Sequence, residues 1–574
     1  MISFEPGDGR YVVRIGRLSV SQSTFMITAA IVVGVGGGFG AVGFRALIAA
    51  ANWLAFGVLG TFLSRHVGQV GVVLVLALGG AVAAFVASRF APEAKGHGVP
   101  EVMEAVALRG GVMRPRVIAI KALASATSIG FGGSCGREGP IVQIGSAIGS
   151  VLGQIPRAPA PIVRTLVACG AAAGISATFN APIGGVFFAS EVILGEFAPR
   201  SFAAIVVASV ISAVIGRSFL GNHPSFSAAG FVLVSPWELV LYALLGMLAA
   251  VWAMGFVNLL YAAEDGFERL RIPRTLKGAI GFAGVGVIGI WFPQIFGVGY
   301  GVIQQVFYSH VPPAHAITLA VLKPLATSLT LGSGGSGGVF APSLFTGAFL
   351  GDGFGALAHH AFPSWTGPAA AYGLVGMAAV FAAASEAPIT SIMIVFEMSN
   401  DYTIILPLMV AVVIASLLGR RLLGATIYER KLLRRGIDWQ RIRNPKVFAR
   451  VSVSQVGRPP PLIAQSRQTI RSLALEGANS TELALPVCDG KRFIGIVHLS
   501  DVSHGLAAGN GECEIGTIVL PAQGILSSSD TLERAATLMA DPRAPLLPVI
   551  AAGELVGVVT RRDLLAAYRS VVKV

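Results

Sequence analysis

The chain has 574 residues, of which 54% are hydrophobic and only 12% are charged, and its mean hydropathy is +0.73. Soluble domains carry about a quarter charged residues, so this composition excludes an ordinary soluble protein and indicates a membrane protein. The formal net charge of +13 lies largely in segments that flank apolar stretches, which indicates membrane orientation and argues against a nucleic-acid partner.

Residues 1–20 form a polar N-terminal segment without the short apolar core of a signal peptide. Arg10, Arg14 and Arg17 precede the first apolar stretch, and a cluster of arginines and lysines follows the last one. By the positive-inside rule, both termini are expected in the cytoplasm of a multi-pass protein of the inner or plasma membrane.

Apolar stretches recur throughout residues 21–436. Several approach the roughly 20 residues that an α-helix needs to cross a bilayer, and several are shorter. The expected fold class is therefore a polytopic α-helical membrane protein with broken or tilted helices.

This region contains an internal repeat. The segment from Lys121 aligns without a gap on the segment from Lys323, and the segment from Gly170 aligns on the segment from Gly376. Inverted repeats of this kind are typical of transporters, in which broken helices meet near the middle of the bilayer. The two halves are expected at about residues 21–225 and 235–436.

Three glycine-rich corners each precede an apolar helix: GHGVPEV from Gly96, GREGP from Gly136 and GGVFAP from Gly337. The first turn of a helix has unpaired amides and a partial positive charge, so it stabilises an anion without a full cation. Three such corners in one chain favour an anion site between half-helices. The alternative is that the glycines serve only close helix packing.

These corners, in this order and followed by Tyr428 in ATIYERKLL, resemble the signature segments of the CLC family of chloride channels and chloride/proton exchangers. The resemblance covers about residues 20–435. It implies eighteen helices in two antiparallel halves, a homodimer in the lipid bilayer with one pore per subunit, and transport of chloride or a similar monovalent anion. It implies no required cofactor and no metal. The residues implied to line the anion path are Gly96, His97, Gly98, Gly136, Arg137, Glu138, Gly338, Val339, Phe340 and Tyr428.

Glu138 would be the gating residue by this resemblance. A carboxylate at an anion site competes with the anion for the same amides, so an ionised Glu138 closes the path and a protonated one leaves it. An ion pair with Arg137 is not expected, because adjacent residues on a helix do not face each other, and Arg137 is expected to be a structural anchor. Lys121 and Lys323 occupy equivalent positions in the repeat. One interpretation is that both side chains extend to the membrane interface.

Two positions depart from the family pattern. Exchangers usually carry a second, internal glutamate at the position of Val192, and valine cannot relay a proton. We therefore expect passive conduction without tight proton coupling; the alternative is exchange through another proton route. His97 stands where chloride-selective members commonly have serine, and its ring either donates to the anion or turns away.

Residues 437–450 are expected to be a linker into a cytoplasmic α/β part. The segment from Leu485 matches the segment from Leu547 without a gap, each reading strand, turn, strand, helix. This duplication resembles a tandem pair of CBS domains. The copies are expected at residues 451–510 and 511–574.

A CBS pair implies a possible adenine nucleotide in the cleft between its copies. Thr560 and Asp563 fit a contact to phosphate and ribose, whereas His498 stands in place of the hydroxyl that would precede Asp501. Asp501 and Asp563 are also placed to cap helices. The alternative role of the pair is to stabilise a dimer.

An enzyme is not expected, because the membrane part has no Ser/His/Asp set, HExxH motif or Walker A loop. The alternative function of another class is that of a non-transporting nucleotide sensor, in which the membrane part only anchors the CBS pair. The complete GREGP corner argues against that sensor.

Overall fold

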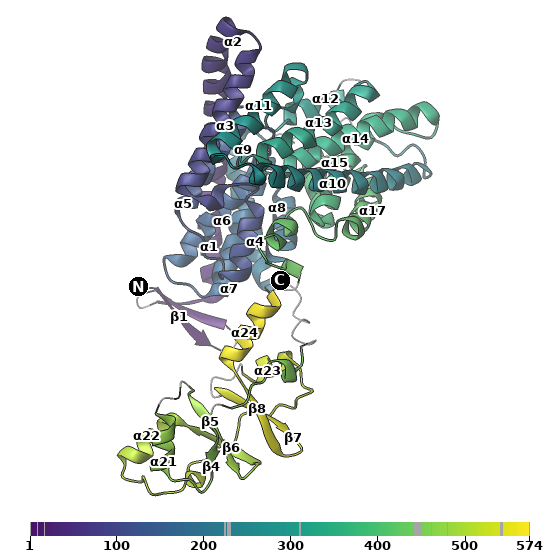
Figure 1. Ribbon diagram of the computed structural model, residues 1–574. Coiled ribbons are helices and arrows are strands. Elements are labelled where there is room, and N and C mark those ends of the chain that lie inside the picture. Colours follow the sequence, from purple (N-terminus) through teal and green to yellow (C-terminus); the bar gives the residue numbers. More distant parts are fainter. Residues whose placement is uncertain are drawn as a thin grey trace. The chain divides into compact units, whose positions relative to one another are not determined.

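A computed structural model describes residues 2–7, 10–15, 18–222, 226, 231–308, 311–440, 451–460, 462–478, 480, 482–539 and 544–572. The chain forms two compact units, Met1–Lys431 and Leu432–Val574 (Figure 1). Most of the predicted linker, residues 441–450, lies outside the described residues.

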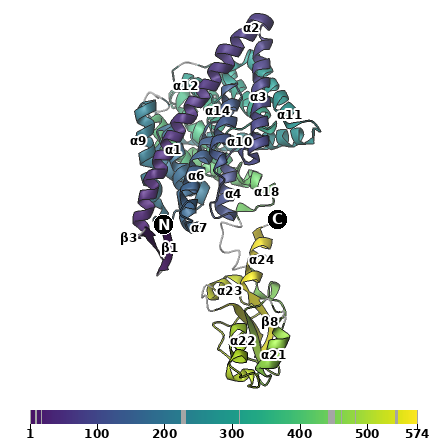
Figure 2. The ribbon, with the colours of Figure 1, turned by 90° about the vertical axis from the view of Figure 1, so that its left-hand side faces the viewer.

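Unit 1 begins with a small antiparallel sheet that the sequence analysis did not predict. Its strands are β1 (Ile2–Gly7), β2 (Arg10–Ile15) and β3 (Leu18–Ser21), paired in the order β1-β2-β3. Ser21 caps the first membrane helix, because its hydroxyl accepts the Thr24 amide at 3.1 Å. Figure 2 shows the sheet at the N-terminal end of that helix.

The rest of unit 1 is helical. Its first half contains α1 (Gln22–Asn52), α2 (Thr61–Val67), α3 (Val70–Phe90), α4 (Val99–Leu108), α5 (Arg116–Gly130), α6 (Glu138–Gln154), α7 (Ala160–Phe179), α8 (Pro182–Phe188) and α9 (Pro199–Leu220). Its second half contains α10 (Glu238–Arg269), α11 (Arg274–Trp291), α12 (Tyr300–Tyr308), α13 (Pro313–Gly332), α14 (Phe340–Ala361), α15 (Ala369–Ser385), α16 (Pro388–Ser399) and α17 (Ile405–Leu423). The short α18 (Glu429–Leu433) follows. Seven helical segments of the described chain are long and apolar enough to cross a membrane, and others are shorter, as the sequence predicted.

Equivalent glycine contacts in the two halves confirm the internal repeat. An ideal Cβ on Gly145 of α6 would lie 2.2 Å from the Gly170 carbonyl oxygen of α7. In the second half, a Cβ on Gly347 of α14 would lie 2.2 Å from the Gly376 carbonyl oxygen of α15. Only glycine permits such backbone contact, so the same helix crossing is built twice.

Contacts along α3 show on which side of the membrane its neighbours begin. Its N-terminal end packs at Gly71 against Leu63 of α2, so α3 returns toward the side from which α1 starts. Gly80 of α3 faces Gly278 near the start of α11, whereas Val73 faces Gly286. Helix α11 is therefore antiparallel to α3, and it carries the chain from the N-terminal side of unit 1 to the opposite side.

The two repeated lysines are buried and do not snorkel. Lys121 and Lys323 are both 0% exposed. The Lys121 ammonium donates to the carbonyls of Ala94 and Gly96 at 3.0 and 2.8 Å. Lys323 donates in the same way to the carbonyls of Ile295 and Gly297, both at 2.8 Å. The interpretation as interfacial anchors was wrong, because each ammonium replaces water for two buried carbonyls.

Unit 2 contains one five-stranded sheet in the order β4-β5-β6-β8-β7. The strands are β4 (Ala464–Gln465), β5 (Ala484–Asp489), β6 (Arg492–His498), β7 (Leu546–Ala551) and β8 (Glu554–Thr560). The helices are α21 (Ile470–Gly477), α22 (Leu499–Ala507), α23 (Leu532–Leu538) and α24 (Arg561–Val572). Each copy of the duplicated segment forms strand, turn, strand and helix, as its repeat predicted.

The two hydrophobic cores of unit 2 do not follow the predicted division at residue 510. Val453 belongs to the core of the second copy, together with Leu526 and Val549. Ile515 belongs to the core of the first copy, together with Val487. The chain therefore exchanges short segments between the copies at both of their N-terminal ends.

Candidate functional site

The three glycine-rich corners lie in direct contact. Gly136 and Gly338 exchange two backbone hydrogen bonds, because the amide of each donates to the carbonyl of the other at 2.7 and 2.6 Å. Gly96 is joined to the third corner in a similar way: its amide donates to the Gly335 carbonyl at 3.3 Å, and its carbonyl accepts the Gly337 amide at 3.2 Å. These bonds join segments of both repeats into one backbone frame.

Each corner opens a helix, as predicted. Helix α4 begins at Val99, α6 begins at Glu138 and α14 begins at Phe340. The positive ends of three helix dipoles are therefore held together by the frame.

The glycines of the predicted set build the frame and do not offer free amides. The amides of Gly96, Gly136 and Gly338 have the partners just described, and the Gly98 amide donates to the Glu101 carboxylate at 3.1 Å. The amides of these glycines are therefore used within the frame, and that the glycines line the anion path stays a prediction. In the described chain, the amides of two other predicted residues, Val339 and Phe340, show no such partner.

Glu138 lies inside this frame and is 1% exposed. Its Oε2 accepts the Ala341 amide of α14 at 3.4 Å, and its Oε1 accepts the Tyr300 hydroxyl at 2.6 Å. Arg137 Nε lies 4.0 Å from Glu138 Oε1, so the dismissal of that ion pair was wrong. Arg137 is the cap residue of α6 and not part of its regular turn, so the rule for neighbours within a helix does not apply.

Tyr300 is a residue of the site that the sequence analysis missed. It opens α12, directly after a GVG segment that begins at Gly297. The available signal was the spacing, because GVGYG begins 201 residues after GHGVP, one residue short of the 202 residues between Lys121 and Lys323, and these two lysines hold the two segments. The alignment from Lys121 began after the first of these segments and so did not reveal the second.

Tyr261 of α10 contacts both the His97 ring and the backbone just before Tyr428. The His97 ring is 4% exposed and stands edge-on to the Tyr261 ring, with 6.2 Å between centroids. Its Nδ1 is buried and has no hydrogen-bond partner in the described part of the chain. The Tyr261 hydroxyl donates to the Ile427 carbonyl at 2.6 Å, which fixes the backbone just before Tyr428. Tyr428 is 2% exposed and is close enough to Glu138 for electrostatic interaction.

Val192 is 6% exposed and lies in the π-helix Ala189–Leu194. Its neighbour Glu191 accepts the Thr390 amide at 2.8 Å and thereby caps α16 of the other half. Glu397 of α16 accepts the Gly184 amide of α8 at 2.6 Å. The two glutamates share a structural role, because each caps a short helix of the opposite half.

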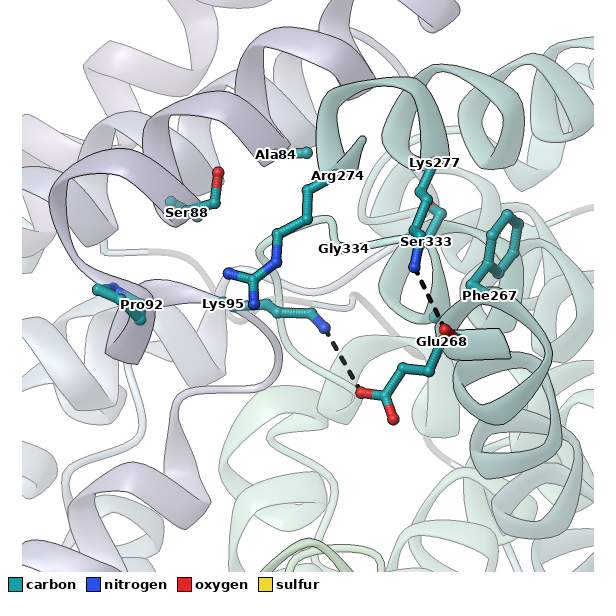
Figure 3. A pocket seen from close by; sticks show the side chains of 12 residues that line it. Ala84, Ser88, Pro92, Lys95, Phe267, Glu268, Arg274, Lys277, Ser333 and Gly334 are labelled. Carbon is teal, nitrogen blue, oxygen red and sulfur yellow. Dashed lines mark hydrogen bonds and ion pairs between the residues drawn. The ribbon is translucent and has the colours of Figure 1, made fainter. Parts of the chain in front are cut away.

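A cationic cavity of about 360 Å³ lies beside the corners on the N-terminal side of unit 1 (Figure 3). Lys95, just before the first corner, lines it together with Arg274 and Lys277 of α11, and Glu268 is the acidic residue on its wall. Ser333 and Gly334, shortly before the third corner, complete the wall nearest the glycine frame. Three cations against one carboxylate give this cavity a positive potential, which raises the local concentration of anions.

In unit 2, Thr560 and Asp563 are already hydrogen-bonded to each other. Asp563 Oδ2 accepts the Thr560 amide at 2.9 Å and its hydroxyl at 2.6 Å, while Arg458 Nε donates to Oδ1 at 3.0 Å. Asp563 is thus the third residue of α24 and reaches back to Thr560, so the expectation that it is itself the N-cap was wrong. Asp501 holds the equivalent position in α22, where His498 is the N-cap and makes no side-chain cap bond.

The geometry defines a class: a multi-pass membrane protein with an inverted repeat and three helix N-termini around one buried carboxylate. Residues 79–420 match the family model of voltage gated chloride channels, and residues 525–570 match that of CBS domains. The chain belongs to the CLC family of voltage gated chloride channels and related transporters. Transport of anions across a membrane is the activity of that family, so the chain is a transport protein and not an enzyme.

Relatives of two kinds are similar to this chain. A protein of Ralstonia nicotianae, provisionally named a ClcB-like chloride channel protein, is 36% identical over 351 residues, which is 60% of this chain and 81% of that protein. The H(+)/Cl(-) exchange transporter ClcA of Vibrio campbellii is 34% identical over 374 residues, which is 62% of this chain and 78% of that protein.

Solved structures show the same fold. A slow cyanobacterial Cl-/H+ antiporter, 28% identical, aligns over 71% of this chain and 97% of its own with a TM-score of 0.67. A eukaryotic CLC transporter, 21% identical, aligns over 95% of this chain and 99% of its own with a TM-score of 0.69. The second comparison concerns the fold alone.

Proposed function

We propose that the chain conducts chloride or a similar monovalent anion passively, with Glu138 as the gate. The observation that carries this proposal is the place of the Glu138 carboxylate, which accepts the Ala341 amide at the start of α14 and so fills the corner that an anion would use. Protonation would remove the charge that holds this carboxylate against the helix N-terminus, and the corner would become free for the anion.

The absence of tight proton coupling is proposed from Val192. This buried side chain can neither bind nor release a proton, and its neighbour Glu191 is already engaged in capping α16. The cationic cavity would gather the anion on the N-terminal side, which we propose to be cytoplasmic. The Val339 and Phe340 amides, the His97 ring and the Tyr428 hydroxyl would then contact it.

Chloride/proton exchange is the second candidate, and one observation favours it. Glu264 of α10 is buried and paired with Lys431, and both interact electrostatically with the buried His97. This cluster would offer a proton route from the N-terminal side that does not pass through Val192.

The reversal potential of the purified protein in liposomes distinguishes the two candidates. For passive conduction, a tenfold chloride gradient gives about 59 mV for a single charge, and an opposing pH gradient leaves that value unchanged. A shift with the pH gradient would contradict passive conduction. If the shift occurs and Glu264→Gln abolishes it, the exchanger with the Glu264 route replaces our proposal. Protein-free liposomes serve as the control.

For unit 2, we propose one adenine-nucleotide site at Thr560 and Asp563, with Arg458 as the group that must move aside or turn to the phosphates. Asp501 would not form a second site, since His498 supplies no hydroxyl. Calorimetry of the full-length protein in detergent with ATP, ADP and AMP is expected to show binding with one nucleotide per chain. Loss of that heat in Asp563→Asn, with unchanged heat in Asp501→Asn, would support the assignment, and no heat with any nucleotide would contradict it.

We also propose that two copies of the chain associate in the membrane, each with its own anion path. The support is the family membership of the chain.

A further inference from the structure

The segment GVGYG from Gly297, called here the Tyr300 segment, is the second half's counterpart of the first corner, GHGVP from Gly96, called here the His97 corner. Gly297 and Gly299 have φ of +58° and +90°, as Gly96 and Gly98 have +80° and +87°. A helix starts directly after each pair, at Tyr300 in the second half. Lys121 holds the first segment and Lys323 holds the second.

The two segments approach the glycine frame from opposite sides of unit 1. The His97 corner follows α3, which ends on the N-terminal side, and the Tyr300 segment follows α11, which ends on the other side. Tyr300 therefore reaches Glu138 from the side opposite to the cationic cavity.

Tyr300 is held rigidly in this position. The guanidinium of Arg137 lies over its ring, 5.2 Å from the centroid. The rings of Phe179 and Phe226 meet it edge-on, with centroids 6.0 and 5.7 Å away. Phe179 also packs against Phe340 of the third corner at 5.1 Å. The packing of the ring therefore points the Tyr300 hydroxyl toward Glu138 independently of the hydrogen bond between them.

The Tyr300–Glu138 hydrogen bond depends on the state of the gate. A phenol donates most strongly to an ionised carboxylate, and it can do so here only while that carboxylate lies in the corner. The charged or titratable groups that interact with Glu138 are Arg137 of its own cap, Cys135 of the same corner, Tyr300 of α12, Lys323 of α13 and Tyr428 after α17. Tyr300 and Ala341 are the partners that donate hydrogen bonds to it across the repeat interface.

We infer that Tyr300 is a positioning residue for anion transport: its hydroxyl latches the ionised Glu138 in the closed position. Opening of the path then requires loss of this bond together with protonation of the gate. The inference rests on the proposed role of Glu138 and adds a second residue, from the other half of the molecule, that sets how readily the gate opens.

The test is chloride flux from proteoliposomes as a function of pH and chloride concentration, with Tyr300→Phe. Phenylalanine keeps the ring and its packing and removes only the donor. Because the ionised, closed form loses a charge-assisted hydrogen bond, the midpoint of the pH–flux curve is expected to rise by about one pH unit. The KM for chloride is expected to fall, since the anion competes with a more weakly held carboxylate.

Tyr308→Phe is the matched control, because Tyr308 ends the same helix and is 68% exposed. It should leave both values unchanged. Site-specific 3-fluorotyrosine at position 300 gives a second measurement with almost unchanged volume. Its more acidic hydroxyl is a stronger donor, so the midpoint should move to lower pH, opposite to Tyr300→Phe.

Measurements in the Glu138→Gln protein test the positioning role of Tyr300 separately from the gating role of Glu138. If the latch is correct, Tyr300→Phe has no further effect in that background. A pH midpoint that stays in place in Tyr300→Phe, or an equal change of flux with and without Glu138, would overturn the latch. If Glu138→Gln itself leaves the pH profile unaltered, the proposed gate fails, and the latch fails with it.

Discussion

Glu138→Gln is expected to raise chloride flux at pH 7 and to remove its dependence on pH. Glutamine keeps the size of the side chain but cannot carry the negative charge that competes with the anion at the start of α14. A hydrogen bond to a charged group contributes about 1.5 to 3 kcal/mol, so its loss should free the corner for an anion in at least about ten times as many molecules. Chloride efflux from proteoliposomes between pH 4 and pH 8 measures this effect.

Glu104→Gln is the control for that experiment. Glu104 lies on α4 and pairs at 2.8 Å with Arg109, the C-cap of that helix, at the end opposite to the first corner. Its variant should show the wild-type pH profile. A Glu138→Gln protein that folds normally but keeps the wild-type profile would remove Glu138 from the gate and the passive, gated mechanism with it.

Lys323→Met is expected to lower the free energy of unfolding by about 2 to 6 kcal/mol, because it removes the donor to the buried Ile295 and Gly297 carbonyls, and an unsatisfied buried polar group costs about 1 to 3 kcal/mol. Its ammonium also lies over the Phe345 ring at 4.9 Å, and that contact is lost as well. Lys121→Met is expected to lower the free energy of unfolding by less, because the Ala94 carbonyl also accepts the Ser336 hydroxyl at 2.7 Å and the Gly96 carbonyl also accepts the Gly337 amide at 3.2 Å. Thermal unfolding in detergent measures both losses.

Lys277→Met is the matched control, because Lys277 is partly exposed and donates only one long bond, at 3.4 Å, to the Glu268 carbonyl. Its stability should stay close to that of the wild type. If Lys121→Met and Lys323→Met change the free energy of unfolding as little as Lys277→Met does, then the two buried lysines do not stabilise the loops before α4 and α12.

The sequence predicted the class of fold because its signals are local or repeated. Apolar length indicated membrane helices, and glycine followed by a helix start indicated the corners at Glu138 and Phe340. Gap-free alignment of the chain on itself revealed both duplications. The fold and the family follow from such patterns without knowledge of any contact.

Several details could not be predicted from these patterns, because they depend on how the two halves pack. Whether Lys121 is a surface anchor or a buried donor depends on where the Ala94 and Gly96 carbonyls lie. The glycines were expected to line the anion path, and only the structure shows that the Gly96, Gly136 and Gly338 amides pair with neighbouring segments. Arg137 looked separate from Glu138 because the rule for adjacent residues within a helix was applied to a residue that caps the helix.

The sequence by itself determined that this chain is a duplicated membrane protein with three helix-opening corners, since glycine, proline and apolar spacing act over a few residues. The tertiary structure alone decided that Tyr300 meets Glu138, two residues far apart in the chain and in opposite halves. That contact exists because the antiparallel halves bring the start of α12 against the start of α6, and no local pattern in the sequence encodes a distance between them.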